Sequence, residues 1–162
     1  MLPDQLKANP AAAALDARVA DAITGGHAEH GEATLFILPS RIVEVCRFLK
    51  DEQKFARLSG ITAVDWDPAD PRFEVVYLLH SLEKNLRLRL KCWVSEAQCE
   101  IDSVTGVWRG ADWYEREVFD MFGIGFRNHP DLRRILMPND WEGNPLRKDY
   151  PVHGHKYSYQ HE

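Results

Sequence analysis

The nine residues LRLRLKCWV, at positions 86–94, do more to decide the fold than any other stretch of this sequence. Apolar side chains alternate with Arg, Lys and Trp along them, and this period of two is typical of a β-strand with one buried and one solvent-facing side. The runs at 33–38, 61–66 and 72–82 are also rich in apolar and β-branched residues and are predicted strands. The sequence therefore predicts a sheet of about four strands.

Helices are predicted on either side of the first strand. Asn9 followed by Pro10 indicates a helix start, because the Asn side chain accepts free amides of the first turn and Pro lacks the amide that would be unpaired there. We expect this helix to end at the two glycines 25–26. A second amphipathic helix is expected from Ser40 onward, where apolar residues recur at helical spacing.

A third helix is predicted over residues 112–122. Asp112 is positioned to cap its first amides, Glu115 is positioned to return the bond, and Gly123 provides a left-handed stop. The connection at 67–71, DPADP, is a predicted turn because its prolines cannot pair in a ladder. Short connections between successive strands favour antiparallel pairing.

The sequence changes character after residue 126. Residues 127–162 mix prolines, histidines and charges of both signs without an apolar period. They also carry Ile135, Leu136 and Trp141, side chains that a solvated tail normally avoids. Because the spacing of these groups does not allow them to be buried locally, we expect the segment to lie on a second protein.

These elements together predict an α+β fold. Residues 1–126 are expected to form a small, helix-covered, mixed or antiparallel sheet of about four strands. Residues 127–162 are expected to form an extended C-terminal arm that wraps a partner subunit. One hydrophobic core is expected, because a chain of this length buries roughly 70% of its unfolded surface.

Composition excludes several classes of function. The formal net charge of −5 and the sequence pI of about 5.8 argue against a nucleic-acid binder, which requires a concentrated basic face. No apolar run approaches the roughly 20 residues of a membrane span, so we expect a soluble, cytoplasmic chain. The three cysteines are scattered, without a Cys-x-x-Cys pair, and indicate neither a disulfide framework nor a cluster-binding loop.

No metal or nucleotide site is predicted. Among the arm histidines 129, 153, 155 and 161, the pair His153 and His155 is nearest to a chelate, but no Cys or acidic ligand lies at metal-site spacing. The glycines of 123–125 follow a predicted helix, whereas an anion-binding loop precedes one. The chain is therefore expected to hold no cofactor.

Three carboxylates in the third predicted helix raise the alternative of acid–base chemistry. Glu115 and Glu117 point to opposite sides of a helix and cannot share one substrate. Arg116 and Asp120 are one turn apart and are expected to form an ion pair. A structural or interface role is favoured, and a stand-alone hydrolase that uses these carboxylates with an arm histidine remains the rival hypothesis. A regulatory binding module is a third.

Four strings in the last third of the chain resemble the signature of one family. They are EREVFDMFGI (115–124), HPDLRRIL (129–136), DWEG (140–143) and PLRKDYP (145–151). Together they resemble the 30-kilodalton subunit, also called the C subunit, of respiratory NADH:quinone oxidoreductase, or complex I. The looser stretch 73–94, continuing through Ser103 and Trp108, is similar to the sheet region of that family.

The resemblance implies membership of the hydrophilic arm of a proton-translocating enzyme, with no catalytic residues in this chain itself. It implies that FMN and iron–sulfur clusters lie in partner subunits, and that this chain contacts chiefly subunits D, B and I, with its C-terminal arm wrapping the first of them. The complex would lie on the cytoplasmic side of the bacterial inner membrane, and only the complex would bring this chain there. Ferredoxin-linked complexes and membrane-bound hydrogenases use a homologous subunit and remain the alternative.

Charged and aromatic side chains of the third helix and the arm are the candidate partner interface. Guanidinium groups between apolar anchors suit such a surface, because they form bidentate contacts. The expected interface residues are Glu115, Arg116, Glu117, Asp120, His129, Arg133, Arg134, Trp141, Arg147, Lys148 and Tyr150. Of these, the anchor chemistry of Trp141, Arg147 and Tyr150 makes them the expected hot spots.

Overall fold

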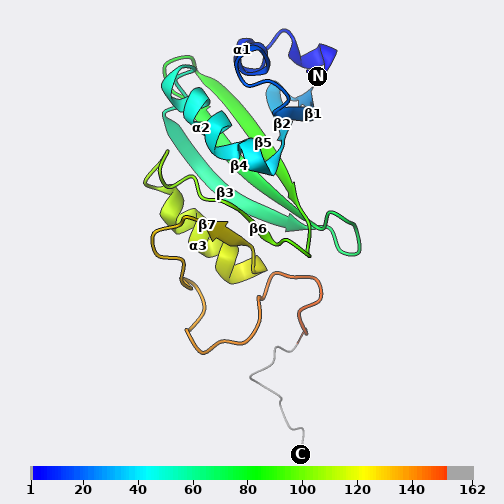
Figure 1. Cartoon of the computed structure of the whole chain (residues 1–162), viewed down its shortest axis with the longest axis vertical. Helices are drawn as coiled ribbons and strands as arrows, with labels where there is room; N and C mark the ends of the chain where they lie inside the picture. Colours follow the sequence, from blue (N-terminus) through cyan, green and yellow to red (C-terminus); the bar gives the residue numbers. More distant parts are fainter. Residues whose placement is uncertain (1, 153–162) are drawn as a thin grey trace, which may run out of the picture.

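The computed structural model describes residues 2–152 and places a five-stranded mixed sheet at the centre of the molecule (Figure 1). The spatial order of the strands is β1-β2-β5-β4-β3, and a second sheet pairs β6 with β7. The strands are β1 (Ile23–Glu29), β2 (Glu32–Ile37), β3 (Arg57–Asp65), β4 (Phe73–Ser81), β5 (Leu86–Val94), β6 (Glu100–Asp102) and β7 (Gly125–Arg127). The helices are η1 (Asp4–Leu6), α1 (Pro10–Arg18), η2 (Pro39–Arg41), α2 (Ile42–Asp51) and α3 (Ala111–Phe122).

Strand β5 lies in the middle of the large sheet, as its alternating sequence favours. It pairs antiparallel with β4, which pairs antiparallel with β3, and it pairs parallel with β2. Leu88, Leu90 and Cys92 are buried, whereas Arg87 is exposed. The α+β class and the mixed sheet are therefore confirmed.

The sheet has five strands, where the sequence analysis expected about four. Asn9 caps α1 as predicted, its side chain accepting from the amides of Ala11 and Ala12, but the helix ends at Arg18. The glycines that we expected to stop the helix lie inside strand β1. Gly26 has φ +155°, and a Cβ there would stand 2.3 Å from a backbone oxygen of β2, so glycine lets the two strands approach.

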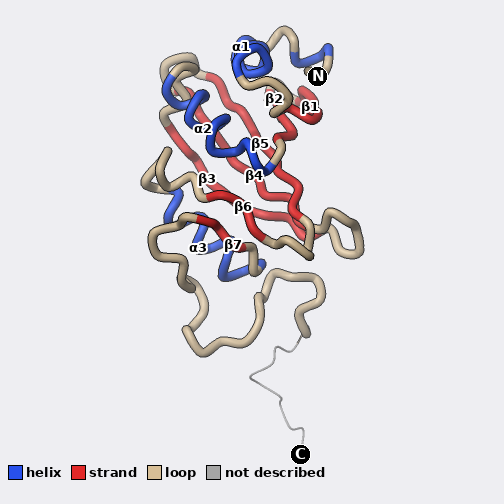
Figure 2. Tube along the Cα trace, in the orientation of Figure 1, coloured by secondary structure: helices blue, strands red, loops and turns tan. Residues whose placement is uncertain are grey.

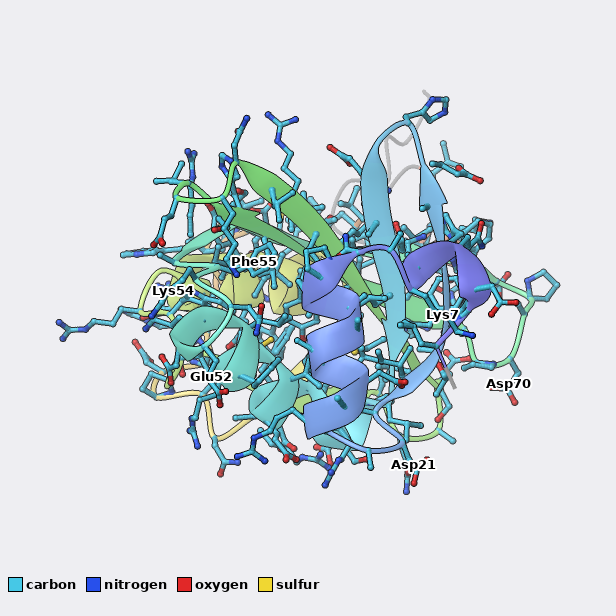
Figure 3. The ribbon with its side chains drawn as sticks, turned by 90° about the horizontal axis from the view of Figure 1, so that it is seen from above. Lys7, Asp21, Glu52, Lys54, Phe55 and Asp70 are labelled. Carbon is cyan, nitrogen blue, oxygen red and sulfur yellow. The ribbon has the colours of Figure 1, made fainter. Side chains whose placement is uncertain are left out.

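The helices lie on one face of the large sheet. Figure 3, which looks down the long axis, shows α1 and α2 side by side on the same side of the strands. Helix α3 packs against β3, and its buried Val118 and Met121 belong to the same core as Tyr77 of β4. The other face of the sheet carries no helix of residues 2–152.

The structure confirms one of the two predicted ends of helix α3. Gly123 ends it in the left-handed conformation with φ +77°. At the other end the helix begins at Ala111, after Gly110, without a side-chain cap. The predicted cap at Asp112 is therefore wrong, because Asp112 lies within the first turn and the carboxylate of Glu115 accepts from Ser103 and Val104 instead.

Beyond β7 the chain continues without helix or strand as far as it is described, as the tan tube of Figure 2 shows. Arg127, the first residue of the predicted arm, belongs to β7. We call residues 128–152 the arm from here on. The predicted arm residues 153–162, including His153, His155 and His161, lie outside the described residues.

Candidate partner-binding interface

The arm is first fastened to its own domain by the carboxylate of Asp120. This side chain lies fully buried in the last turn of α3. Its Oδ2 accepts the backbone N–H groups of Ile135 at 3.0 Å, Leu136 at 2.8 Å and Met137 at 2.8 Å. Its Oδ1 accepts from the guanidinium of Arg134. Burial raises the pKa of Asp120, and the amide and Arg134 hydrogen bonds outweigh burial and lower it, so the ionised form holds the arm.

Arg116 also binds the arm, and it does so in a way that corrects the sequence prediction. We expected Arg116 to pair with Asp120 one turn away. Instead its Nε and Nη2 donate to the carbonyl oxygens of Arg133 and Arg134, each at 3.2 Å. Its guanidinium also stacks on the ring of Trp113, 5.2 Å from the centroid. The ion-pair partner of Asp120 is therefore Arg134, an arm residue.

The arm also covers the C-terminal end of α3. Asn144 donates through Nδ2 to the carbonyl oxygens of Phe119 and Asp120 in the last turn of the helix, where the carbonyl of Phe119 also accepts the amide of Gly123. A Cβ at Gly123 would stand 2.7 Å from Oδ1 of Asn144. Gly123 is thus required both for its positive φ and for the close approach of the arm.

A second anchor joins the arm to the end of strand β3. Arg72 is buried and forms a bidentate pair with Asp65, with both N–O distances at 2.8 Å. It also reaches Asp149 of the arm at 3.1 Å, and the amide of Lys148 donates to Asp65 at 2.8 Å. The hydrogen bonds from Arg72 hold the pKa of Asp65 well below its usual range. Sequence analysis missed this site, because its members are far apart in the chain.

Arg147 reinforces the second anchor. Its guanidinium donates to Asp149 at 2.9 Å and 2.7 Å, and to Glu96 at 2.6 Å. It lies over the ring of Phe73, 5.2 Å from the centroid. The hydrogen bonds from Arg147 and then from Arg72 hold the pKa of Asp149 well below its usual range. The expectation that the arm has no place on its own domain is therefore wrong at both anchors.

Apolar side chains of the arm divide into two groups. Leu132 and Met137 pack against the core of the domain. Leu136 and Leu146 point away from it and remain 59% and 56% exposed, and Trp113 of α3 is 60% exposed. We call Trp113, Leu136 and Leu146 the apolar arm surface. Exposed large apolar groups among arginines are typical of protein-binding surfaces.

The predicted interface residues fall into three classes of exposure. Buried are Glu115, Arg116 and Asp120; partly buried are His129, Arg134, Trp141, Arg147 and Tyr150; exposed are Glu117, Arg133 and Lys148. The buried three make contacts within the chain, so they can serve an interface only by shaping the arm. Whether the other eight contact a partner stays a prediction.

Glu115 occupies a buried polar cluster beneath the start of the arm. Ser103 Oγ donates to its carboxylate at 2.6 Å and the amide of Val104 at 2.7 Å. The side chain of His129 is buried beside it, with Nε2 3.9 Å from Glu115 Oε2 and 3.4 Å from Asp112 Oδ1. Burial raises the pKa of Glu115 to about 7, and the Asp112 charge adds to the rise.

The arrangement of the helix carboxylates does not support the rival hydrolase. Glu115 is buried and Glu117 is exposed on another side of α3, as the predicted divergence of the two side chains requires. Within residues 2–152, no three His, Cys, Asp or Glu side chains are grouped to hold a metal ion. None of the helices in this part of the chain has the length and hydropathy of a membrane span.

Comparison with known proteins decides the family. Residues 35–156 match the model of the family described as respiratory-chain NADH dehydrogenase, 30 Kd subunit. This chain belongs to that family. The matched region contains β3 to β7, all of α2 and α3, and both anchors of the arm. As a member of the 30 Kd subunit family, the chain is part of an NADH-quinone oxidoreductase.

Several relatives are named as the C subunit of NADH-quinone oxidoreductase. The protein of Geotalea uraniireducens is 46% identical over 94% of this chain and 93% of its own length. That of Geobacter sulfurreducens is 51% identical over 76% of this chain and 77% of its own length. In Rhizobium etli, the protein named C 2 is 50% identical over 86% of this chain and 75% of its own length.

Two solved structures share the fold of this family member. One is described as the trypsin-resistant fragment (1–134) of Nqo5; it is 34% identical, with a TM-score of 0.59, over 63% of this chain and 83% of that one. The other comes from the membrane-bound sulfane sulfur reductase, an archaeal respiratory membrane complex. It has a TM-score of 0.74 at 24% identity over 86% of this chain and 83% of that one, a likeness of fold alone.

Proposed function

We propose that this chain is a cofactor-free structural member of a proton-translocating NADH:quinone oxidoreductase, and that its arm docks on the D subunit. The observation that carries the proposal is the arm itself. Two anchors hold the arm against its own domain, and the apolar arm surface remains exposed. A partner that covered this surface would bury apolar area worth about 25 cal/mol per Å².

The anchors reduce the conformational entropy that the arm loses when it docks. A free segment loses entropy when it binds, whereas hydrogen bonds to Asp120 and Asp65 order this arm beforehand. Preorganisation suits permanent membership of a complex, because it lowers the cost of association. By docking on the D subunit, with subunits B and I as its further neighbours, the chain would hold cofactor-bearing subunits in place. FMN and the iron–sulfur clusters would belong to those neighbours, on the cytoplasmic side of the membrane.

The test is a substitution of the apolar arm surface in the intact complex. Leu136→Ser combined with Leu146→Ser should reduce the amount of the D subunit that co-purifies with this chain and lower quinone reductase activity in membranes to a similar extent. Leu82→Ser is the matched control, because Leu82 is 63% exposed and follows the end of β4 that is remote from the second anchor. Full assembly of the double variant would contradict docking through the arm.

A further inference from the structure

The face of the large sheet that no described helix covers carries a row of basic side chains. Register places Arg57 of β3 opposite His80 of β4, and His80 opposite Arg87 of β5. Residues directly opposite in antiparallel strands project to the same face. Arg89 follows on the same face of β5, opposite Leu78. A chain with a net charge of −5 thus gathers positive charge on one end of one surface.

These side chains surround a hollow of about 390 Å³. Gly60 helps to open it, because it stands opposite Leu78 without a side chain to fill the space between the strands. Leu78 provides an apolar floor, and the arginines form the rim. The volume lies within the range of binding sites for small ligands and single side chains. The lining residues are Glu32, Arg57, Ser59, Leu78, Leu79, His80, Arg87, Leu88 and Arg89.

The positive charge of the row is only partly neutralised within the chain. Glu32 lies 3.6 Å from Arg87 and 3.2 Å from Arg89, so one carboxylate serves two guanidinium groups. Arg57 has no ion-pair partner among residues 2–152. Arg57 and Arg87 are each directly opposite His80 and are two strands apart. An anion from a second molecule can therefore pair with Arg57 without displacing Glu32 from the other two arginines.

The spacing of the row identifies the kind of anion. Adjacent strands are about 4.8 Å apart, so Arg57 and Arg87 start about 10 Å from each other. Two carboxylates, one for each guanidinium group, fit that span. In an extended peptide, acidic residues four positions apart are separated by about 13 Å, and long arginine side chains make up the difference. The residue midway between them projects to the same side and lies over His80, next to Leu78 on the same face of β4.

We propose that the uncovered sheet face binds an extended acidic segment of a neighbouring protein. Arg57 and Arg87 take two carboxylates of the segment, and an apolar side chain between them lies over His80 and beside Leu78. This surface is distinct from the arm. It lies at the Arg57 end of β3, whereas the second anchor lies at Asp65, eight residues and about 26 Å further along the strand. The proposal does not depend on the docking of the arm.

The first experiment uses the full chain and a defined probe. Chemical-shift mapping by NMR with the peptide Glu-Ser-Leu-Ser-Glu should perturb amides of 57–60, 78–80 and 87–89 in a saturable way, and binding should weaken as salt is added. The isosteric peptide Gln-Ser-Leu-Ser-Gln should not bind. The proposal would be overturned if those amides showed no saturable shifts or if the neutral peptide bound equally well. It would also be overturned if an equal concentration of inorganic phosphate displaced the acidic peptide.

Charge variants separate the site from general electrostatics. Arg57→Glu with Arg87→Glu should weaken the binding of the acidic peptide by at least about tenfold. The matched control is Arg18→Glu with Arg47→Glu, which changes net charge equally at exposed arginines outside the hollow and should leave binding unchanged. If both pairs weakened binding alike, only net charge would matter and the site would be refuted.

Thermal unfolding of a milder variant keeps the test valid if the variant with Arg57→Glu and Arg87→Glu folds poorly. Arg57→Gln should leave the thermal midpoint within about 2 °C of the parent, because Arg57 has no ion-pair partner among residues 2–152, and should weaken peptide binding. Binding that was retained in this folded variant would contradict the proposal. In the intact complex, a photo-crosslinking residue at Ser59 should capture a protein segment that contains two acidic residues. Capture of lipid, or of a segment without them, would also overturn it.

Discussion

The carboxylate of Asp120 in the last turn of α3 accepts the backbone amide of Met137 at 2.8 Å, across the whole first bend of the arm. One buried acidic group thus sets the path of a segment that has no secondary structure of its own. A carboxylate near a helix C-terminus is unfavourable for the helix dipole, so the contacts with the arm must offset that cost as well as the cost of burial.

Asp120→Ala should release the arm and destabilise the domain. It leaves the guanidinium of Arg134 and three amides without their acceptor, a loss that we expect to cost about 3 kcal/mol in the free energy of unfolding. Urea denaturation measures the loss, and amides 135–137 should exchange faster with deuterium. Glu117→Ala, on the exposed side of the same helix, is the control. Unchanged protection of those amides in the Asp120 variant would disprove the anchor.

Glu115 should make stability depend on pH. Its pKa is raised from 4.5 to about 7 in the folded chain, so the folded state holds a proton that the unfolded state has lost between these values. The contribution to stability is therefore complete below pH 4.5 and is lost as the pH rises through 7, at up to about 1.4 kcal/mol per pH unit. Glu115→Gln should flatten this slope, whereas Glu117→Gln should preserve it.

Denaturation curves between pH 5 and 8 test the pH prediction. The groups that face Glu115 are Asp112 and His129, and His129→Gln distinguishes the effect of the histidine from that of the carboxylate itself. A slope that survived Glu115→Gln but disappeared with His129→Gln would assign the titration to the histidine instead.

Ionisation of Asp65 should change the stability of the chain in the opposite direction to that of Glu115, and at lower pH. Hydrogen bonds from Arg72 lower its pKa, so the folded state favours the ionised form. Its stabilisation is present above the unfolded pKa of 3.8 and is lost as the pH falls below that value. Arg72→Lys, which cannot form the bidentate pair, should cost about 2 kcal/mol at pH 7 and reduce the acid sensitivity. Arg41→Lys, at an exposed pair, should change neither.

Tyr77→Phe should leave the chain as stable or stabilise it by about 1 kcal/mol. The Tyr77 hydroxyl is buried and has no hydrogen-bond partner among the described residues, so removing it relieves a desolvation cost. Thermal unfolding of the two proteins measures the difference. A marked loss of stability would contradict the desolvation cost assigned to the Tyr77 hydroxyl.

The regular parts of the fold could be predicted because their signals are local. The alternation at 86–94 identified β5, and Gly123 identified the end of α3. Strand β1 was missed because two glycines and His27 conceal its pattern, and its support comes from pairing with β2. The short strands β6 and β7 carry three residues each, too few for a period to be read.

The anchors of the arm could not be predicted from the sequence. Its apolar residues indicated a surface partner, and the family resemblance based on residues 115–151 is confirmed. Asp120 and Asp65, however, bind residues remote in sequence, and no spacing rule connects them. One signal was present in the sequence. An aspartate in the last turn of a helix interacts unfavourably with the helix dipole, so a compensating contact is expected.

The contact of Asn144 with the C-terminal end of α3 affects how the chain folds during synthesis. A growing polypeptide is released from its N-terminus onward, so α3 emerges before the residue that covers its final carbonyls. Until Asn144 and Leu146 have left the ribosome, the last turn of α3 lacks the contacts that these residues make with the carbonyls of Phe119, Asp120 and Met121, although Gly123 already bonds the first of these carbonyls. Completion of this helix during synthesis therefore waits for the arm, and a nascent chain arrested before Asn144 would expose an unfinished end to proteases and chaperones.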